Sequence, residues 1–568
     1  MVICGLKLTH DASVAVIENG RLLFSVEVEK IANNKRYSEI GDLSQIESIL
    51  HSQGMKPGDI DRYVIDGWGG RPGLEGVLAL VDQKEGRNLK LRVASYGEAT
   101  LKESVLQKSY FSNGLTIGQT SFAYTSYMHV AGHIFGAYCA SPFAMANEPS
   151  YVLVWDGGQY PRLYYVDPVR RIVENKGPLF SILGSIYAIM GNYFGPYRHT
   201  EEQLAENARR RAVEGYVGGY LSTAGKLMSY IALGSVQHDL LRELHSIHKR
   251  EQEPVSGFEH RYALAVRDYV KGRGYSDADV LLTQHVYLEQ LLIQSLTAKV
   301  AKDGMAAQNF CFAGGSALNI KWNSAIRDSG LFRSTWVPPF PNDAGSGIGA
   351  ACCEMFNEGT IALQWDVYCG PSISQGSLQQ GWRMQPSSAS NLAQILSEKN
   401  EPIVLLLGSA ELGPRALGNR SILAPATHQG MKTHLNHIKS REEFRPVAPI
   451  CMEQHASNVF DPGTPDPYML FDHRVRKSWM DRVPAICHLD GTARLQTINA
   501  IQNPFVYEVI SEYEKLTGIP LLCNTSANMN GSGFFPDVES AMRWGGCNYI
   551  YSDGTLYEKE TPTPIHLD

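Results

Sequence analysis

The sequence predicts an α/β protein of two domains, the first of them built from a duplicated unit. At 568 residues the chain exceeds the size at which one hydrophobic core stops growing. Apolar runs at residues 2–8, 13–17 and 21–28 are separated by a polar break and by Asn19-Gly20, a pattern typical of strand hairpins. A similar pattern of strand, polar turn and strand returns at residues 151–166. We therefore expect a duplicated α/β domain whose two polar tips face each other across a cleft.

The stretch between residues 201 and 301 is predicted to be a helical insertion. Within it, apolar residues recur with near-helical spacing at Leu281, Leu288, Leu292 and Leu296. Two transitions from strand to helix follow, FCFAGGSALNIKWNSAI and WVPPFPNDAGSGIGAACCEMF, each with small residues at the turn. Glycine-rich turns that open helices are favourable phosphate sites.

A segment rich in Ser, Gln, Gly and Pro at residues 369–391 is predicted to separate the two domains. A second α/β region begins near Pro402. The expected domains are therefore residues 1–368 and residues 369–568.

Composition and charge narrow the classes of partner. Hydrophobic residues make up 43% of the chain and charged residues 19%, an ordinary globular balance. A formal net charge of -7 gives no general attraction for nucleic acid or anionic membranes. The 10 cysteines include no C-x-x-C pair, and neither a secretory signal nor a run of ~18 apolar residues is present. We expect a cytoplasmic protein with small-molecule partners, without nucleic acid or membrane.

A metal site is indicated by His129 and His133 in SYMHVAGHIFGAY, because a spacing of four places both imidazoles on one face of a helix. The alternative is a pair of core histidines. Asp156 in the DGG turn and Asp343 in FPNDAGSGIG are the natural candidates to complete the ligand set, although either could be a turn or helix-capping residue. A mixed site of histidines and carboxylates would suit iron, manganese or zinc.

Several glycine-containing turns could contact a nucleotide. Gly314 and Gly315 end a predicted strand and open a helix, and Lys226 lies in AGKLMSYIALG, which is equally well explained as a plain helix end. No Walker A motif is present.

A basic segment stands out in this acidic chain. ELGPRALGNRSILAP and NHIKSREEFRPVAP bring five cationic residues together: Arg415, Arg420, Lys439, Arg441 and Arg445. Guanidinium groups bind phosphates through paired hydrogen bonds, so the segment could hold phosphorylated ligands such as a nucleotide polyphosphate. The alternative is a solvated basic face, which the Pro-Arg-Ala-Leu-Gly and Phe-Arg-Pro contexts do not resemble. Arg494 and Asn524 are further candidates in the same half.

Taken in order, these segments resemble the carbamoyltransferase family of the nodulation, cephamycin, aminoglycoside (tobramycin-type) and ansamycin O-carbamoyltransferases. The resemblance covers essentially the whole chain, and it is carried by these motifs: THDASVAVIENGRLLFSVEVEK, HVAGH, WDGG, GKLMSYIALG, AGGSALN, NDAGSGIGA, GPRALGNRSIL, KSREEFRP, DGTARLQT and CNTSAN.

The resemblance implies an actin-like first domain of the ASKHA class (Kae1-like) and a YrdC-like second domain. The second domain would form carbamoyl-adenylate from ATP and carbamoyl phosphate, and the first would transfer the carbamoyl group to a hydroxyl of a small molecule, in natural-product (antibiotic-type) biosynthesis. The implied cofactors are ATP, Mg2+ and Fe2+ or another divalent metal, and a homodimer is the assembly considered.

Residue roles follow from the same resemblance. His10 would act at the acceptor hydroxyl, and the metal would be held by His129, His133, Asp156 and Asp343. Nucleotide contacts in the first domain would come from Gly157, Gly158, Lys226, Gly314, Gly315 and Asn319. Carbamoyl phosphate and ATP in the second domain would be bound by Arg415, Arg420, Lys439, Arg445, Arg494 and Asn524.

One departure and two alternatives stay open. Many relatives have an EEERFxRxKH-like run after the first hairpin, whereas this chain has VEVEKIANNKRY, which resembles the cephamycin-type branch more. An actin-like small-molecule kinase or ATPase would use the same glycine-rich turns without the histidines. A non-enzymatic nucleotide-dependent binding protein would make the histidines structural.

Overall fold

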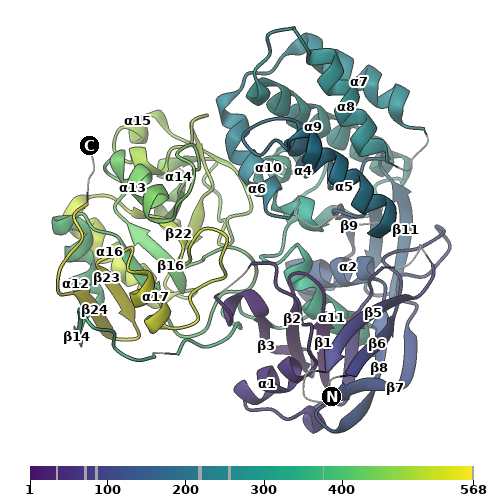
Figure 1. Ribbon diagram of the computed structural model, residues 1–568, viewed down its shortest axis with the longest axis horizontal. Coiled ribbons are helices and arrows are strands. Elements are labelled where there is room, and N and C mark those ends of the chain that lie inside the picture. Colours follow the sequence, from purple (N-terminus) through teal and green to yellow (C-terminus); the bar gives the residue numbers. More distant parts are fainter. Residues whose placement is uncertain are drawn as a thin grey trace.

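The computed structural model describes residues 1–33, 36–69, 73–82, 87–214, 221–253, 257–374 and 376–565. Figure 1 shows two bodies side by side, one formed by the purple to teal part of the chain and one by the green to yellow part. The first body contains two mixed sheets, and the second contains one large sheet. Within the described ranges, none of the helices combines the length and apolar character that a membrane span requires.

The first sheet begins with the predicted hairpin. Asn19 (φ 48°) and Gly20 (φ 83°) are both left-handed, the conformation that joins strands of a tight hairpin. The strand order is β3-β2-β1-β4-β8-β7, with β1 parallel to β4 and β4 parallel to β8. The strands are β1 (Val2–Lys7), β2 (Ser13–Glu18), β3 (Arg21–Glu27), β4 (Arg62–Asp66), β7 (Ser109–Ile117) and β8 (Thr120–Tyr127), with a separate hairpin of β5 (Gly76–Asp82) and β6 (Arg87–Val93).

The second sheet repeats this arrangement. Its order is β11-β10-β9-β12-β13, with two antiparallel pairs on one side of β9 and two parallel pairs on the other, as around β1. The strands are β9 (Ser150–Val154), β10 (Arg162–Asp167), β11 (Ile172–Pro178), β12 (Asn309–Ala313) and β13 (Ser334–Trp336). The shared order and pairing confirm the predicted duplication and the actin-like architecture of the first domain.

Two helices, α2 (His129–Cys139) and α11 (Ser346–Asn357), lie between the two sheets (Figure 1). Every residue of α2 is buried, and one core cluster joins α2 and α11 to strands of both sheets. The helices cross at glycines, because a side chain at Gly349 would approach the Gly132 carbonyl oxygen to 2.0 Å. This layer holds the start of α2 next to the start of α11.

The helical insertion lies between β11 and β12, as predicted. In α9 the residues Leu281, Leu288, Leu292 and Leu296 are buried, and Ser276 caps the first turn. The helices are α4 (Ile186–Tyr193), α5 (Glu201–Glu214), α6 (Thr223–Tyr230), α7 (His238–Glu251), α8 (Phe258–Val270) and α9 (Asp277–Lys302). The remaining helices of this body are α1 (Ser44–Ser52), α3 (Pro142–Met145) and α10 (Ile320–Asp328).

The last part of the chain forms its own sheet and hydrophobic core. The strand order is β14-β24-β23-β15-β16-β22-β17-β21. The strands are β14 (Trp382–Pro386), β15 (Ile403–Leu406), β16 (Arg420–Ala424), β17 (Ala448–Met452), β21 (Gln496–Ile498), β22 (Leu521–Ser526), β23 (Tyr549–Ser552) and β24 (Thr555–Lys559), and a small sheet holds β18 (Phe460–Asp461), β19 (His473–Val475) and β20 (Thr492–Ala493). The helices are α12 (Ala389–Gln394), α13 (Gly430–Ile438), α14 (Glu453–Val459), α15 (Lys477–Met480), α16 (Pro504–Thr517) and α17 (Val538–Trp544). The boundary at residue 368 and the YrdC-like assignment stay predictions.

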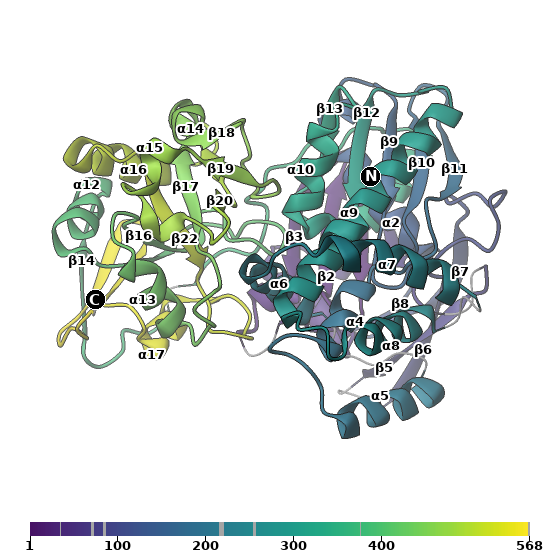
Figure 2. The same cartoon turned by 90° about the horizontal axis from the view of Figure 1, so that it is seen from above.

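Helices α6 and α10 of the first body face the second body (Figure 2). Lys321 of α10 forms ion pairs with Asp472 at 2.9 Å and Asp490 at 2.7 Å, and the rings of Tyr230 and Phe444 lie 5.5 Å apart. The two bodies are therefore joined by charged and aromatic contacts.

Candidate active site

Four side chains from both halves of the duplicated domain meet at the centre of the first body. His129, His133, Asp156 and Asp343 each offer one ligand atom, and these atoms lie within 4.8 Å of one another. The two histidine Nε2 atoms are 3.1 Å apart, and each lies 3.5 Å from Oδ1 of Asp343. All four residues are buried. The spacing of four on α2 thus brings the imidazoles together as predicted.

We call the four side chains of His129, His133, Asp156 and Asp343 the metal cluster. Their position follows from the topology. Asp156 follows the end of β9, and His129 begins the helix after β8. Asp343 begins the short 3-10 helix η5 (Asp343–Gly345) that leads into α11. Its carboxylate faces the histidines and Lys7 instead of capping the helix. The carboxyl ends of parallel strands are where ligands bind in open α/β sheets.

A second set of side chains orients the metal cluster. Asp66 accepts a hydrogen bond from Nδ1 of His129 at 2.7 Å, so Nε2 of that ring presents its lone pair to the cluster. The buried ammonium of Lys7 lies 2.9 Å from Asp66 and 2.9 Å from Asp343. Burial alone would raise the pKa of Asp343, but Lys7, His129 and His10 outweigh it and hold the pKa well below its usual value. Asp343 therefore stays a carboxylate.

Asp156 is held by two contacts from opposite lobes. The Tyr96 hydroxyl donates to Oδ2, and the Gly315 N–H donates to Oδ1 at 2.7 Å. The ring of Tyr96 also packs on His129 with centroids 4.6 Å apart. A divalent cation fits this donor set, because two imidazole nitrogens and two carboxylates converge, and Asp66, Lys7 and Tyr96 hold His129, Asp343 and Asp156 from outside.

His10 lies beside the metal cluster, in the turn after β1. Its Nε2 is 3.6 Å from Asp343 and its Nδ1 is 3.2 Å from Asp11. The indole of Trp68 contacts the His10 ring edge-on at 5.1 Å. The His10 side chain keeps 21% exposure, so a small molecule can reach it.

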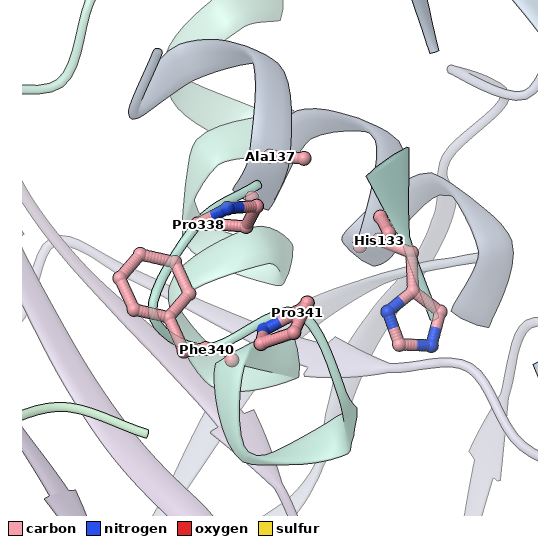
Figure 3. Close-up of a pocket in the computed structure, with 9 residues that line it drawn as sticks. His133, Ala137, Pro338, Phe340 and Pro341 are labelled. Atoms are coloured by element: carbon pink, nitrogen blue, oxygen red, sulfur yellow. The ribbon is translucent and has the colours of Figure 1, made fainter. Parts of the chain in front are cut away.

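A small hollow lies next to His133 (Figure 3). His133 and Ala137 line one wall from α2, and Pro338, Phe340 and Pro341 line the other. The labelled side chains around His133 are apolar, which keeps water away from this ring.

The second candidate site is an arginine cluster in the second body, formed by Arg415, Arg441, Arg445 and Arg494. Among the described residues, the buried Nε atoms of Arg415, Arg441 and Arg494 have no hydrogen-bond partner. Burial and the charges of Arg494 and Arg36 lower the pKa of Arg415 well below its usual value. Burial together with Arg445 lowers the pKa of Arg494 to about 10. Unpaired buried guanidinium donors at this density favour a polyanion as ligand.

Three other predicted residues of this half are engaged with the protein itself. The Lys439 ammonium donates to Asn528 O and Oδ1, both at 2.8 Å, and so holds the loop after β22. Arg420 donates to four carbonyl groups, those of Leu407, Gly408, Asn419 and Pro371. Asn524 donates to Ala416 O at 3.1 Å and Gln496 Oε1 at 2.8 Å, while its buried Oδ1 has no partner among the described residues. Lys439 and Arg420 thus shape the loops around the arginine cluster.

The predicted nucleotide turns surround Asp156. Gly314 (φ 86°) has no room for a side chain, which would approach the Trp155 carbonyl oxygen to 2.5 Å. Gly157 and Gly158 are exposed at the tip after β9, and Asn319 caps α10. Lys226 lies elsewhere, 5.1 Å above the Tyr197 ring, whose hydroxyl donates to Glu442 at 2.7 Å. Lys226 is therefore on the side facing the arginine cluster.

One short element connects the two sites. The 3-10 helix η4 (Gly315–Leu318) donates from the Gly315 N–H to Asp156 at its first residue. At its last residue, the Leu318 carbonyl accepts a hydrogen bond from Arg415 Nη2 at 3.3 Å. The contacts at the two ends of η4 therefore link the metal cluster to the arginine cluster.

Comparison with known proteins matches both bodies. Residues 2–352 match the family model "Carbamoyltransferase N-terminus", and residues 393–550 match "Carbamoyltransferase C-terminus". The chain belongs to the carbamoyltransferase family. This carbamoyltransferase is 46% identical over 582 residues to "Nodulation protein U" of Sinorhizobium fredii, which covers 99% of this chain and 100% of the relative.

A second relative named for its activity is also similar throughout. "3'-Hydroxymethylcephem-O-carbamoyltransferase" of Streptomyces clavuligerus is 30% identical over 553 residues, which covers 96% of each chain. Over the whole chain the identity to nodulation protein U is higher, 46% against 30%, and the resemblance of residues 26–37 to the cephamycin-type branch stays a prediction.

Solved structures match only part of the chain, and only loosely. An activator of 2-hydroxyisocaproyl-CoA dehydratase from Clostridium difficile with bound ADPNP is 14% identical, covers 63% of this chain and 96% of its own, and gives a TM-score of 0.32. HypF in a phosphate- and nucleotide-bound form is 11% identical, covers 62% of this chain and 55% of its own, and gives a TM-score of 0.31.

Sequence reasoning missed several residues around the carbamoyltransferase's metal cluster. Lys7 and Asp66 are the last residues of β1 and β4, and Trp68 and Tyr96 pack against His129. The available signal was a single charge at the end of an apolar strand, in VICGLK and in RYVID. Such a charge has to find a partner once the strand is buried.

Proposed function

We propose that this chain is an ATP-dependent O-carbamoyltransferase that uses carbamoyl phosphate as donor and carbamoyl-adenylate as intermediate. The acceptor is a hydroxyl group of a small molecule in a natural-product pathway. The proposal rests on the position of η4, which joins the arginine cluster to the metal cluster and His10. A labile intermediate formed at one end therefore has a short way to the other.

The first step takes place at the arginine cluster. Water releases carbamate and phosphate from carbamoyl phosphate, and a carbamate oxygen then attacks the α-phosphorus of ATP. Carbamoyl-adenylate forms and pyrophosphate leaves. Arg415, Arg445 and Arg494 bind the phosphate oxygens through charge-assisted hydrogen bonds. For Arg415 and Arg494 these bonds engage guanidinium groups whose buried Nε atoms have no partner among the described residues. Mg2+ accompanies ATP as part of the substrate.

The second step takes place at His10. The acceptor oxygen attacks the carbonyl carbon, the bond to the phosphate oxygen breaks, and AMP leaves with the bonding electrons. His10 accepts the hydroxyl proton, a role supported by its partial exposure next to Asp343. General-base assistance of this kind contributes typically ~10²–10⁴-fold.

The metal cluster would hold Fe2+ or another divalent ion through His129, His133, Asp156 and Asp343. Such an ion would act as a Lewis acid that polarises the reacting carbonyl or neutralises phosphate charge. The chain's own contribution is to fix the ligands: Asp66 sets the His129 tautomer, Lys7 holds Asp343, and Tyr96 holds Asp156.

The test is an assay of both half-reactions with the full-length protein. With MgATP and carbamoyl phosphate it should release pyrophosphate, and acceptor alcohols should gain one carbamoyl unit in mass. Arg445→Ala should stop pyrophosphate release, whereas Arg333→Gln, which removes a surface arginine paired with Glu148, should not. A folded protein that releases no pyrophosphate would favour the nucleotide-dependent binding protein, and ADP with a phosphorylated alcohol would favour the kinase.

A further inference from the structure

One cation next to the arginine cluster comes from the opposite body. Arg36 follows β3 and η1 (Val28–Lys30), in the segment that leaves the first sheet. Its backbone N–H donates to the Gly531 carbonyl at 3.4 Å. The neighbouring Asn530 donates through Nδ2 to the Ser440 carbonyl at 2.9 Å. Arg36 thus lies against the loop after β22, which in turn contacts the segment of Lys439 and Arg441.

A buried cross-link holds this segment in place. The Lys30 ammonium lies 2.9 Å from Glu27 and donates to the Gly413 carbonyl at 2.9 Å, and Glu27 accepts the Gly413 N–H at 2.7 Å. The Phe534 N–H donates to the Glu29 carbonyl at 3.0 Å. Gly413 lies two residues before Arg415, so these hydrogen bonds hold the segment of Arg36 and the loop of Arg415 together.

The guanidinium of Arg36 lies 5.2 Å from the centroid of the Tyr37 ring and pairs with Glu29, but few of its N–H donors are used. Within the described part of the chain it donates one long hydrogen bond, from Nε to Glu29 at 3.4 Å, although a guanidinium carries five N–H donors. Its side chain is 29% exposed, so a ligand can reach it. After burial and other nearby cations, the charge of Arg36 also contributes to the lowered pKa values of Arg415 and Lys439. Burial lowers the pKa of Arg445 first, and the charge of Arg36 lowers it further against the opposing effect of Glu442.

We propose that Arg36 is a further phosphate-binding residue, so that the polyanion site spans both bodies of the enzyme. This inference rests on the proposed function of the arginine cluster. A polyanion held by Arg36 and Arg415 together is bonded to the sheet that carries His10 and to the loop that activates the donor. The first sheet, through Arg36, therefore takes part in the first step as well as in the transfer.

The test compares Arg36→Gln and Arg415→Gln in the full-length protein, with binding of MgATP and of carbamoyl phosphate measured by calorimetry. Hydrogen bonds to charged groups make each arginine responsible for about 10-fold to 100-fold in affinity. Arg36→Gln should weaken binding of at least one of these ligands by that amount, and Arg36→Lys should recover part of the loss. Arg333→Gln is the control, because it removes an arginine from a surface pair with Glu148.

The variant Glu29→Gln distinguishes a purely structural role of Arg36 from ligand binding. It removes the carboxylate that pairs with Arg36 and leaves the arginine in place. Binding should be unchanged or tighter in this variant. Equal weakening by Glu29→Gln and Arg36→Gln would overturn the proposal, as would Arg36→Gln binding both ligands like the wild type while Arg415→Gln does not. If Arg415→Gln also binds normally, the proposed function of the arginine cluster fails as well.

Discussion

In the metal cluster, the ligands His129, Asp156 and Asp343 each have a partner outside the ligand set. In the arginine cluster, buried guanidinium nitrogens of Arg415 and Arg494 have no partner among the described residues. The metal cluster pairs two imidazoles with carboxylates, and Lys7 and Asp66 complete its charges. The arginine cluster gathers like charges, with Glu442 as the carboxylate near Arg445 at 3.6 Å.

The difference separates two ways of preparing a site. The metal cluster is organised before its ligand arrives, since its outer hydrogen bonds fix the imidazole and carboxylate orientations. The arginine cluster keeps cations close together at a cost in stability that a bound polyanion removes. Mutations should therefore affect function at both sites but stability in opposite directions.

The largest expected effect is at His10, which lies beside the metal cluster. His10→Ala should lower carbamoyl transfer by ~10²–10⁴-fold because the acceptor loses its general base, while pyrophosphate release persists. Both rates are measured in the same assay, with His51→Ala on the exposed face of α1 as control. Equal loss of both activities in His10→Ala would contradict the division of labour between the sites.

Much of the fold could be predicted because local patterns and tertiary structure agree. The Asn19-Gly20 turn and the repeated hairpin gave the duplication, and the leucines of α9 gave the helical insertion. The contact between η4 and Arg415 could not be predicted, since it joins residues 97 positions apart through a carbonyl group that any residue has.

The site residues that could be predicted are those whose side-chain type and spacing suggest a chemical role. Histidines spaced by four and aspartates before glycines are recognisable in a sequence. Arg420 was grouped with the other arginines because all lie in one basic segment, but β16 directs its side chain to carbonyl groups. Arg36 was overlooked because a lone arginine near the N-terminus reveals nothing about the distant loop at Gly531 on which it docks.

The next test asks whether removing a charge from the arginine cluster raises or lowers the free energy of unfolding. Arg415→Met keeps much of the apolar stem and removes one of the mutually repelling charges. Carbamoyl phosphate activation should fall about 10-fold to 100-fold, while the free energy of unfolding stays equal or rises by up to ~1 kcal/mol. Thermal and denaturant unfolding measure this, and Asp156→Asn, which disturbs two satisfied hydrogen bonds, should show the opposite sign. A clear loss of stability in Arg415→Met would show that the cluster is not strained.

The smallest effect is expected at Asp66, which touches the metal cluster only through His129 and Lys7. Asp66→Asn keeps an acceptor for His129 Nδ1 but removes the charge that orients the ring and pairs with Lys7 at 2.9 Å. Divalent metal affinity should fall about 10-fold, at the lower end of the range for such outer partners. Titration of the metal-free protein with Co2+, followed by its visible absorption, measures this without relying on activity.

Asp61→Asn is the matched control, because Asp61 accepts a backbone hydrogen bond at 2.8 Å at the opposite end of the same sheet. An unchanged metal affinity in Asp66→Asn would mean that the four ligands alone determine metal binding. The metal cluster would then not depend on outer partners, and it would not differ in this respect from the arginine cluster.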